Sequence, residues 1–154
     1  MTEKLFDITI EKEEIGKRVR AILGVPETFL TDDVINSPIF IERTKTYINN
    51  AIKEYFKQLK EIEDIDYSLL EISSMYYISY LLCIGMDARL PKQMENLSTK
   101  TLLQNINWDA KALELLNKVH EIIEEFLLEY DIEDDAFNTF AVLSDESEYP
   151  ESNV

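Results

Sequence analysis

"YSLLEISSMYYISYLLCIGMD", residues 67–87, decides the fold. Apolar side chains in this stretch fall on nearly every side of a helix, and Glu71 and Asp87 are its only charged residues. A helix that is apolar all round is covered by neighbouring elements on all sides. The uncharged run within it, residues 72–86, contains three Ser and three Tyr and is shorter than the ~20 residues that span a bilayer. We therefore expect a buried central helix, capped by Asp66, and no membrane segment.

Two longer helices are expected on either side of this central helix. Apolar residues recur every three or four positions from Pro38 to about Glu63, which predicts one amphipathic helix of roughly 40 Å. Asn107 is expected to cap another helix, from Trp108 to about Tyr130, with two adjacent apolar seams. A helix with two seams packs against two partners, within the subunit or beyond it. The seams are Leu113, Leu116, His120, Ile123, Leu127 and Tyr130, and Leu115, Val119, Ile122 and Phe126.

The stretch "AILGVPETFLTDDVINSP", residues 21–38, predicts a sharp corner in the chain. A first helix is expected to begin at Glu11 or Glu14 and to end just before Gly24. Gly24 is positioned to adopt the left-handed conformation that ends a helix, and Pro26 prevents the helix from resuming.

The second half of the corner contains two helix starts. Thr31 is expected to cap a single turn over residues 32–36, with acids at its start, as the helix dipole prefers. Ser37 is expected to cap the next long helix, with Pro38 as its first residue, where a missing N–H costs nothing. Gly24, Pro26, Ser37 and Pro38 are therefore the residues that define the corner.

The N-terminal stretch "LFDITI", residues 5–10, alternates apolar and polar side chains. This period of two predicts a half-buried extended strand that points Phe6, Ile8 and Ile10 to one side. A single strand needs a partner, so these three residues are candidates for docking onto another chain. The alternative is a disordered start that pairs with nothing.

The C-terminal stretch, residues 131–154, is an acidic tail. It holds eight acids and no base, which is half of the net charge of −16. Within it, "AFNTFAVLS" is apolar in a way that a purely solubilising tail does not need. We expect this segment to dock onto a partner as an extended peptide, and the alternative is a tail that folds back on its own bundle. Its candidate docking residues are Phe137, Phe140, Val142 and Leu143.

Length and composition favour a few long elements around one core. A chain of 154 residues that is 45% hydrophobic can bury one core. With only three Gly and four Pro, the chain is expected to contain few turns. A single Cys forms no internal disulfide. The first residues lack the apolar run of a signal peptide. The predicted fold is all-α: a bundle of about four helices over residues 14–130, with an extended arm (residues 1–13) and the acidic, partly extended tail (residues 131–154).

The charge and the scarcity of reactive residues exclude several functions. A nucleic-acid-binding face needs Lys and Arg, whereas 31 acids here face 15 bases. His120 shares a helix face with Glu124, but Asn117 stands where a di-iron bundle needs Glu. Cys83 lies in the most apolar helix, with no base near it in sequence to form a thiolate. Without a phosphate-binding or calcium-binding loop, we expect no catalytic, metal or cofactor site and no enzyme.

Three stretches together resemble a known family. They are "VRAILGVPE" (residues 19–27), "LTDDVI" (residues 30–35) and "INWDAKALELL" (residues 106–116). They occur in the order short helix, corner, long helix, buried Tyr-containing helix, Pro-marked loop, long helix. These stretches and this order are similar to the head–tail connector (adaptor, or head-completion) proteins of tailed bacteriophages, over roughly residues 14–130. The arm and the tail lie outside the resemblance.

The resemblance implies a structural protein of the virion neck, made in the host bacterial cytoplasm. Such a protein forms a homo-oligomeric, dodecameric ring between the portal protein and the next ring of the tail, and DNA passes through the ring without specific binding. An acidic lumen is compatible with this, because it repels phosphate at close range. The alternative from another class is an acidic cytosolic helical interaction module that regulates or inhibits a basic partner. It accounts for the charge and the tail, but not for the corner.

Overall fold

The computed structural model of the chain describes residues 4–86 and 106–132. Within these ranges all regular structure is helical and no strand is present, so the all-α prediction is confirmed. The elements in chain order are α1 (Lys12–Leu23), α2 (Asp32–Ile35), α3 (Pro38–Ile52), the 3₁₀-helix η1 (Lys53–Tyr55), α4 (Phe56–Lys60), α5 (Ser68–Ile84) and α8 (Trp108–Glu129).

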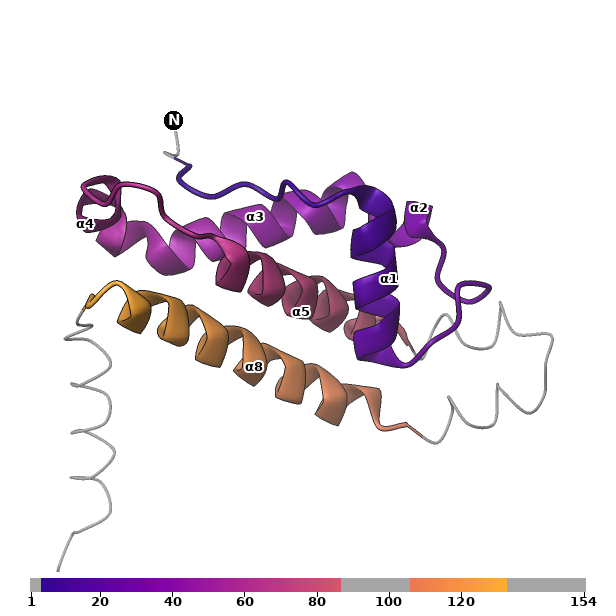
Figure 1. Cartoon of the computed structure of the whole chain (residues 1–154). Coiled ribbons are helices and arrows are strands. Elements are labelled where there is room, and N and C mark those ends of the chain that lie inside the picture. Colours follow the sequence, from indigo (N-terminus) through magenta and orange to yellow (C-terminus); the bar gives the residue numbers. More distant parts are fainter. Residues whose placement is uncertain (1–3, 87–105, 133–154) are drawn as a thin grey trace, which may run out of the picture.

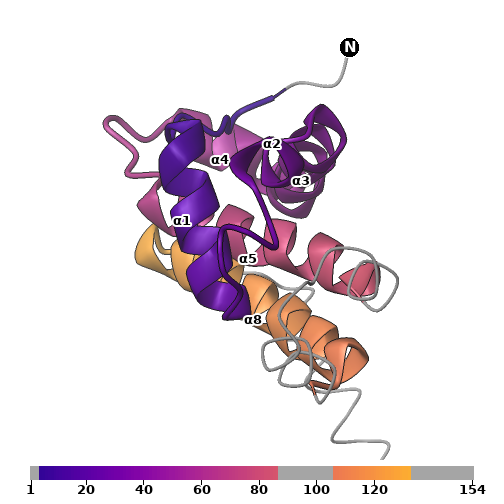
Figure 2. The same ribbon diagram turned by 90° about the vertical axis from the view of Figure 1, so that its right-hand side faces the viewer.

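The bundle is built around α5. Figure 1 shows α3, α5 and α8 running side by side with α5 in the middle, while α1 crosses one end of the bundle. The view along the bundle in Figure 2 gives the same order, with α1 lying across α5 and α8. The most extensive contact in the described part of the chain is between α5 and α8. The prediction that the stretch around residues 67–87 forms the centre of the fold is therefore confirmed.

Serine side chains allow α5 to be buried although it is not purely apolar. Ser73, Ser74 and Ser79 are completely buried. The Ser74 hydroxyl donates to the carbonyl of Leu70 at 2.8 Å, and Ser79 bonds in the same way to the carbonyl one turn before it. Ser73 instead donates to the carbonyl of Val119 in α8, at 3.3 Å. Each buried hydroxyl thus has an acceptor, as burial of a polar group requires.

The expectation that α5 is covered on all sides is wrong at two positions. Ile72 is 39% exposed and Ile84 is 60% exposed. Ile84 is the last residue of the helix. Neighbouring helices therefore bury most of α5, and these two apolar side chains remain open in the described structure.

The single helix expected from Pro38 to about Glu63 is broken into three pieces. It is α-helical to Ile52, continues as the 3₁₀-helix η1, and resumes as α4. After Pro38 at its start, the segment contains neither Gly nor Pro, the usual causes of a kink. The reason lies in tertiary packing, because Phe56 and Leu59 of α4 are buried in a core cluster with residues of α8. Figure 1 shows α4 turned away from the line of α3.

The last long helix begins and ends close to the predicted residues. The Asn107 side chain accepts a hydrogen bond from the backbone N–H of Ala110 at 3.1 Å, which confirms the predicted cap. All four residues of the second predicted seam are buried. The first seam is buried only towards its C-terminal end, and Leu113 at its start is 62% exposed.

Candidate functional site

The corner between α1 and α3 turns at Gly24. Its φ of 69° and ψ of 33° are left-handed, as predicted. The backbone N–H groups of Gly24 and Val25 both donate to the carbonyl of Arg20, at 2.8 and 3.2 Å. A Cβ atom at Gly24 would meet no atom within 4 Å. Glycine is therefore favoured here by the backbone conformation and not by crowding.

A buried ion pair joins the two sides of the corner. Arg20 is 8% exposed, and its Nη1 donates to Oδ1 of Asp32 at 2.6 Å and to the carbonyl of Leu30 at 3.1 Å. A charge-assisted hydrogen bond of this length is among the strong ones in proteins. One guanidinium thus fixes α1 against the start of α2. Nothing in the local sequence pattern predicts this pair.

Gly16 and Asn36 complete the corner. A Cβ atom on Gly16 would lie 1.9 Å from Oδ1 of Asp32, so the carboxylate fits only because this position carries no side chain. The Asn36 amide donates to the carbonyls of Lys12 and Asp32, both at 2.9 Å. The start of α1 and the single turn of α2 are therefore bonded to each other as well.

The predicted helix starts after the turn are confirmed in position. Thr31 precedes α2, Ser37 precedes α3, and Pro38 is the first residue of α3. Neither hydroxyl accepts a capping hydrogen bond from the helix. The corner is thus held by Arg20 and Asn36 and not by the caps that the sequence suggested.

The arm lies against its own bundle. Phe6 is 1% exposed and belongs to a core cluster with residues of α3 and α8. Asn49 of α3 holds the backbone there. Its Oδ1 accepts from the N–H groups of Leu5 and Phe6, both at 3.0 Å, and its Nδ2 donates to the carbonyl of Phe6 at 2.9 Å. Nζ of Lys45 also lies 2.8 Å from Oδ1 of Asp7.

The prediction that the arm forms a strand is wrong. Phe6, Ile8 and Ile10 point inward in alternation with exposed Asp7 and Thr9, but the segment forms no strand. An asparagine side chain satisfies backbone groups that a neighbouring strand was expected to satisfy. Phe6 thus packs into the core of its own chain. Docking of the half-buried Ile8 and Ile10 onto a partner stays a prediction.

The candidate tail residues Phe137, Phe140, Val142 and Leu143 lie outside the described residues.

The two reactive side chains do not meet in a catalytic arrangement. Burial raises the pKa of the Cys83 thiol to about 11, so it carries almost no thiolate at neutral pH. His120 is exposed and shares a hydrogen bond, through Nε2, with the hydroxyl of Tyr47. Among residues 4–86 and 106–132, no group of three or more His, Cys, Asp or Glu side chains could hold a metal ion.

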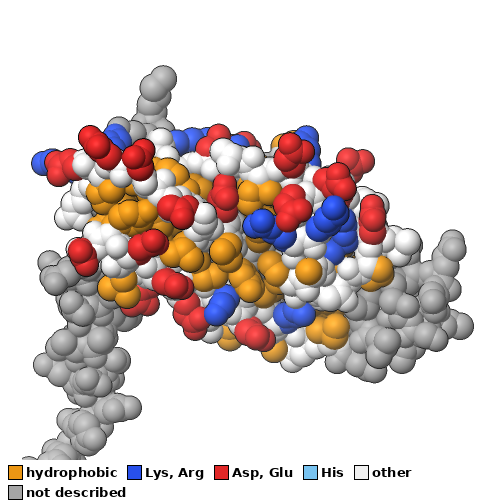
Figure 3. Space-filling view, viewed as in Figure 1, with side chains coloured by type: hydrophobic (Ala, Val, Ile, Leu, Met, Phe, Trp, Pro, Cys, Tyr) orange, Lys and Arg blue, Asp and Glu red, His pale blue; other side chains and the backbone are white. Residues whose placement is uncertain are grey.

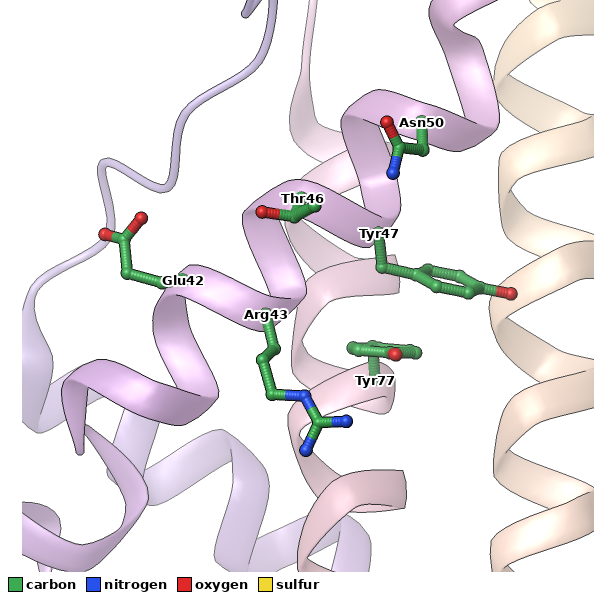
Figure 4. Close-up of a pocket in the computed structure, with 6 residues that line it drawn as sticks. All are labelled: Glu42, Arg43, Thr46, Tyr47, Asn50 and Tyr77. Atoms are coloured by element: carbon green, nitrogen blue, oxygen red, sulfur yellow. The ribbon is translucent and has the colours of Figure 1, made fainter. Parts of the chain in front are cut away.

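A hollow of about 340 Å³ opens beside Tyr47, and we call it the tyrosine hollow. The rings of Tyr47 and Tyr77 stack at its floor, with centroids 4.1 Å apart and planes inclined by 16°. Burial raises the pKa of both hydroxyls, so both rings are neutral at physiological pH. Figure 4 shows the two rings lying parallel, with the Arg43 side chain beside them. The lining residues are Glu42, Arg43, Thr46, Tyr47, Asn50 and Tyr77.

Several large apolar side chains stand exposed outside the core. Figure 3 shows apolar side chains along the middle of one face of the bundle, with acidic side chains around them. The most exposed large apolar residues in the described structure come from α3, α5 and α8. The four that are 60–64% exposed are Ile39, Ile84, Leu113 and Leu128.

In the described parts of the chain, no helix combines the length and the apolar character needed to cross a membrane. Comparison of the chain with protein-family models, with curated proteins and with solved structures finds no match.

Proposed function

We propose that the chain is a head–tail connector of a tailed bacteriophage. In this proposal it is one subunit of a homo-oligomeric, dodecameric ring in the virion neck, between the portal protein and the next ring of the tail. The observation that carries the proposal is the locked corner. It lies within the stretches that resemble the connector family, and Arg20, Asp32 and Asn36 hold it rigidly.

A rigid corner suits a ring because a ring closes only when every subunit repeats the same angle between its contact faces. Charge-assisted bonds across the corner leave α1 and α2, which leads directly into α3, little freedom to change their angle. A flexible linker at this point would let neighbouring subunits take different angles, and the assembly would not close. The corner is the feature that the alternative, an acidic module covering a basic partner, does not require.

The exposed apolar residues support lateral contacts between subunits. A head-to-tail ring needs two different patches on each subunit, one for each neighbour. Ile39 is in α3, Ile84 ends α5, and Leu113 and Leu128 are in α8. Separate helices thus provide apolar groups for two distinct contacts.

The net charge of −16 supports passage of DNA without binding. Acidic groups near a channel repel phosphates at short range, and salt screens this repulsion beyond about 8–10 Å. DNA in the middle of the ring would therefore meet no group that binds its phosphates.

The test is to place a small tag on the chain in its native source and to follow its sedimentation. We expect the tag to sediment with large DNA-filled particles and to be seen at their neck by electron microscopy. Recovery in the slowly sedimenting fraction, with one small basic partner, would overturn the proposal and favour the acidic interaction module.

A further inference from the structure

We propose that the tyrosine hollow binds the chain's own tail segment, residues 136–143, with the ring of Phe140 against the stacked rings of Tyr47 and Tyr77. This inference concerns a single chain and does not depend on the proposed function.

The shape and chemistry of the hollow suit an aromatic side chain. Its volume of about 340 Å³ lies at the lower end of the ~300–1,000 Å³ of ligand pockets. Tyr77 is buried and the Tyr47 ring is stacked on it, so the floor is rigid and aromatic. Aromatic rings favour offset or edge-to-face contact with another ring. Thr46 and Asn50 at the rim can bond to the backbone of an extended peptide.

The charge around the hollow is complementary to the tail. Residues 38–60 contain five cations and two acids, whereas residues 131–154 contain eight acids and no base. Arg43 at the hollow, and Lys53 and Lys57 further along, have no ion-pair partner among the described residues. An acidic segment is the partner that such cations attract.

The other helices offer the acidic tail less positive charge. Three of the four cations of α1 are already paired, as in the contacts of Lys17 with Glu13 and Arg18 with Glu14. Helix α8 carries six acids and two lysines, so it repels the tail. The cations Arg43, Lys53 and Lys57, which form no ion pair within the described residues, therefore lie close together along the chain from α3 to α4.

The tail is long enough to return to the hollow. Ile132, where the described chain ends, is buried and fixes the starting point. Tyr47 contacts His120, which lies nine residues before the end of α8, or about 14 Å along the helix. Phe140 follows Ile132 by eight residues, and an extended chain of that length reaches at most about 29 Å.

The experiment is a disulfide cross-link in the full chain between Asn50→Cys at the rim and Thr139→Cys beside Phe140. The matched control replaces Asn50→Cys by Ala51→Cys, which is also exposed but does not line the hollow. Cys83 stays in both variants, since it is buried. We expect an intrachain disulfide under mild oxidation, measured by intact mass and non-reducing gel, to form at least tenfold faster from position 50 than from position 51.

Two further variants test the contacts. Phe140→Ala and Arg43→Glu should each reduce the rate from position 50 to that of the control, while Lys118→Glu on α8 should leave it unchanged. Equal rates from positions 50 and 51 would overturn the proposal. A disulfide that forms only between two chains would also overturn it, and would assign the hollow to the tail of a second copy.

Discussion

The corner and the arm have the same structural task but are held by different chemistry. In each, a side chain on a helix bonds to a stretch of chain that lies against that helix. At the corner the side chain is the buried cation Arg20, bonded to the carboxylate of Asp32. At the arm it is the neutral amide of Asn49, bonded to the backbone of Leu5 and Phe6.

The difference determines how easily each stretch can detach from the helix that it contacts. Removing one partner of a buried ion pair leaves a charge without compensation, which is strongly destabilising. Releasing the arm exposes Phe6 and separates the surface pair of Lys45 and Asp7. The amide and backbone groups that it leaves can bond to water, at a cost of about 1 kcal/mol for each hydrogen bond. The corner is therefore a fixed joint and the arm a releasable one. In a connector ring, the first would set the angle of the subunit and the second could be exchanged with a neighbour.

The largest expected effect is that of Asp32→Ala. It leaves the Arg20 guanidinium buried with only the Leu30 carbonyl as acceptor. Loss of one partner of a fully buried pair costs about 3–5 kcal/mol, and because the Asp32 side chain is 34% exposed we expect about 2–3 kcal/mol. Urea unfolding followed by the fluorescence of Trp108 measures this, with Asp33→Ala as the exposed control. Equal stability of the two variants would show that the pair does not hold the corner.

Next in size is Gly16→Ala, which pushes a methyl group against the Asp32 carboxylate. We expect a loss of about 1–3 kcal/mol in the free energy of unfolding, as for other overpacked sites. Because the carboxylate must leave Arg20 to make room, the two substitutions should not be additive. Gly16→Ala introduced into Asp32→Ala should cost much less than in the native chain. Full additivity would contradict the link between glycine and ion pair.

Asn49→Ala should cost less, about 1–2 kcal/mol, because it removes neutral hydrogen bonds to the arm. Its matched control is Asn50→Ala, the exposed neighbour on the same helix. Limited proteolysis should cut the arm of the first variant faster, with the bundle intact. Equal protection of the arm in both variants would mean that burial of Phe6 alone holds it.

The smallest effect concerns Asp7, whose pKa is lowered from its ordinary value of 3.8 by the hydrogen bond from Lys45. The unfolded chain therefore takes up the proton more readily, so the contribution of Asp7 to stability is full above pH 3.8 and is lost as the pH falls through the lower folded pKa. Asp7→Asn should be slightly less stable than the native chain at pH 7 and equally stable at strongly acidic pH. A difference that persists in acid would contradict the ion pair.

Local chemistry made the helix ends predictable from sequence. Gly24, Pro38 and Asn107 act on the backbone within a few residues of themselves, and the structure has them in the predicted positions. The apolar run of α5 likewise predicted a central helix. These features depend on neighbours in sequence, which a single chain displays.

Contacts between distant residues were not predictable in the same way. Asn49 bonds to a residue 43 positions away, and Arg20 to one 12 positions away. Nothing in either local pattern distinguishes these side chains from ordinary surface residues, although Gly16 one turn before Arg20 is a signal of close approach. The break at η1 is of the same kind, because Phe56 is buried in a core cluster with residues of α8 and no breaking residue marks the position.

Amide hydrogen exchange of the native chain tests most directly whether the corner is fixed and the arm releasable. The probes are the N–H groups of Val25 and Asn36 at the corner and those of Leu5 and Phe6 in the arm. We expect the corner amides to exchange only through global unfolding, and the arm amides to exchange at least tenfold faster through local opening. Equal protection of the two sets would contradict the difference between a fixed joint and a releasable one.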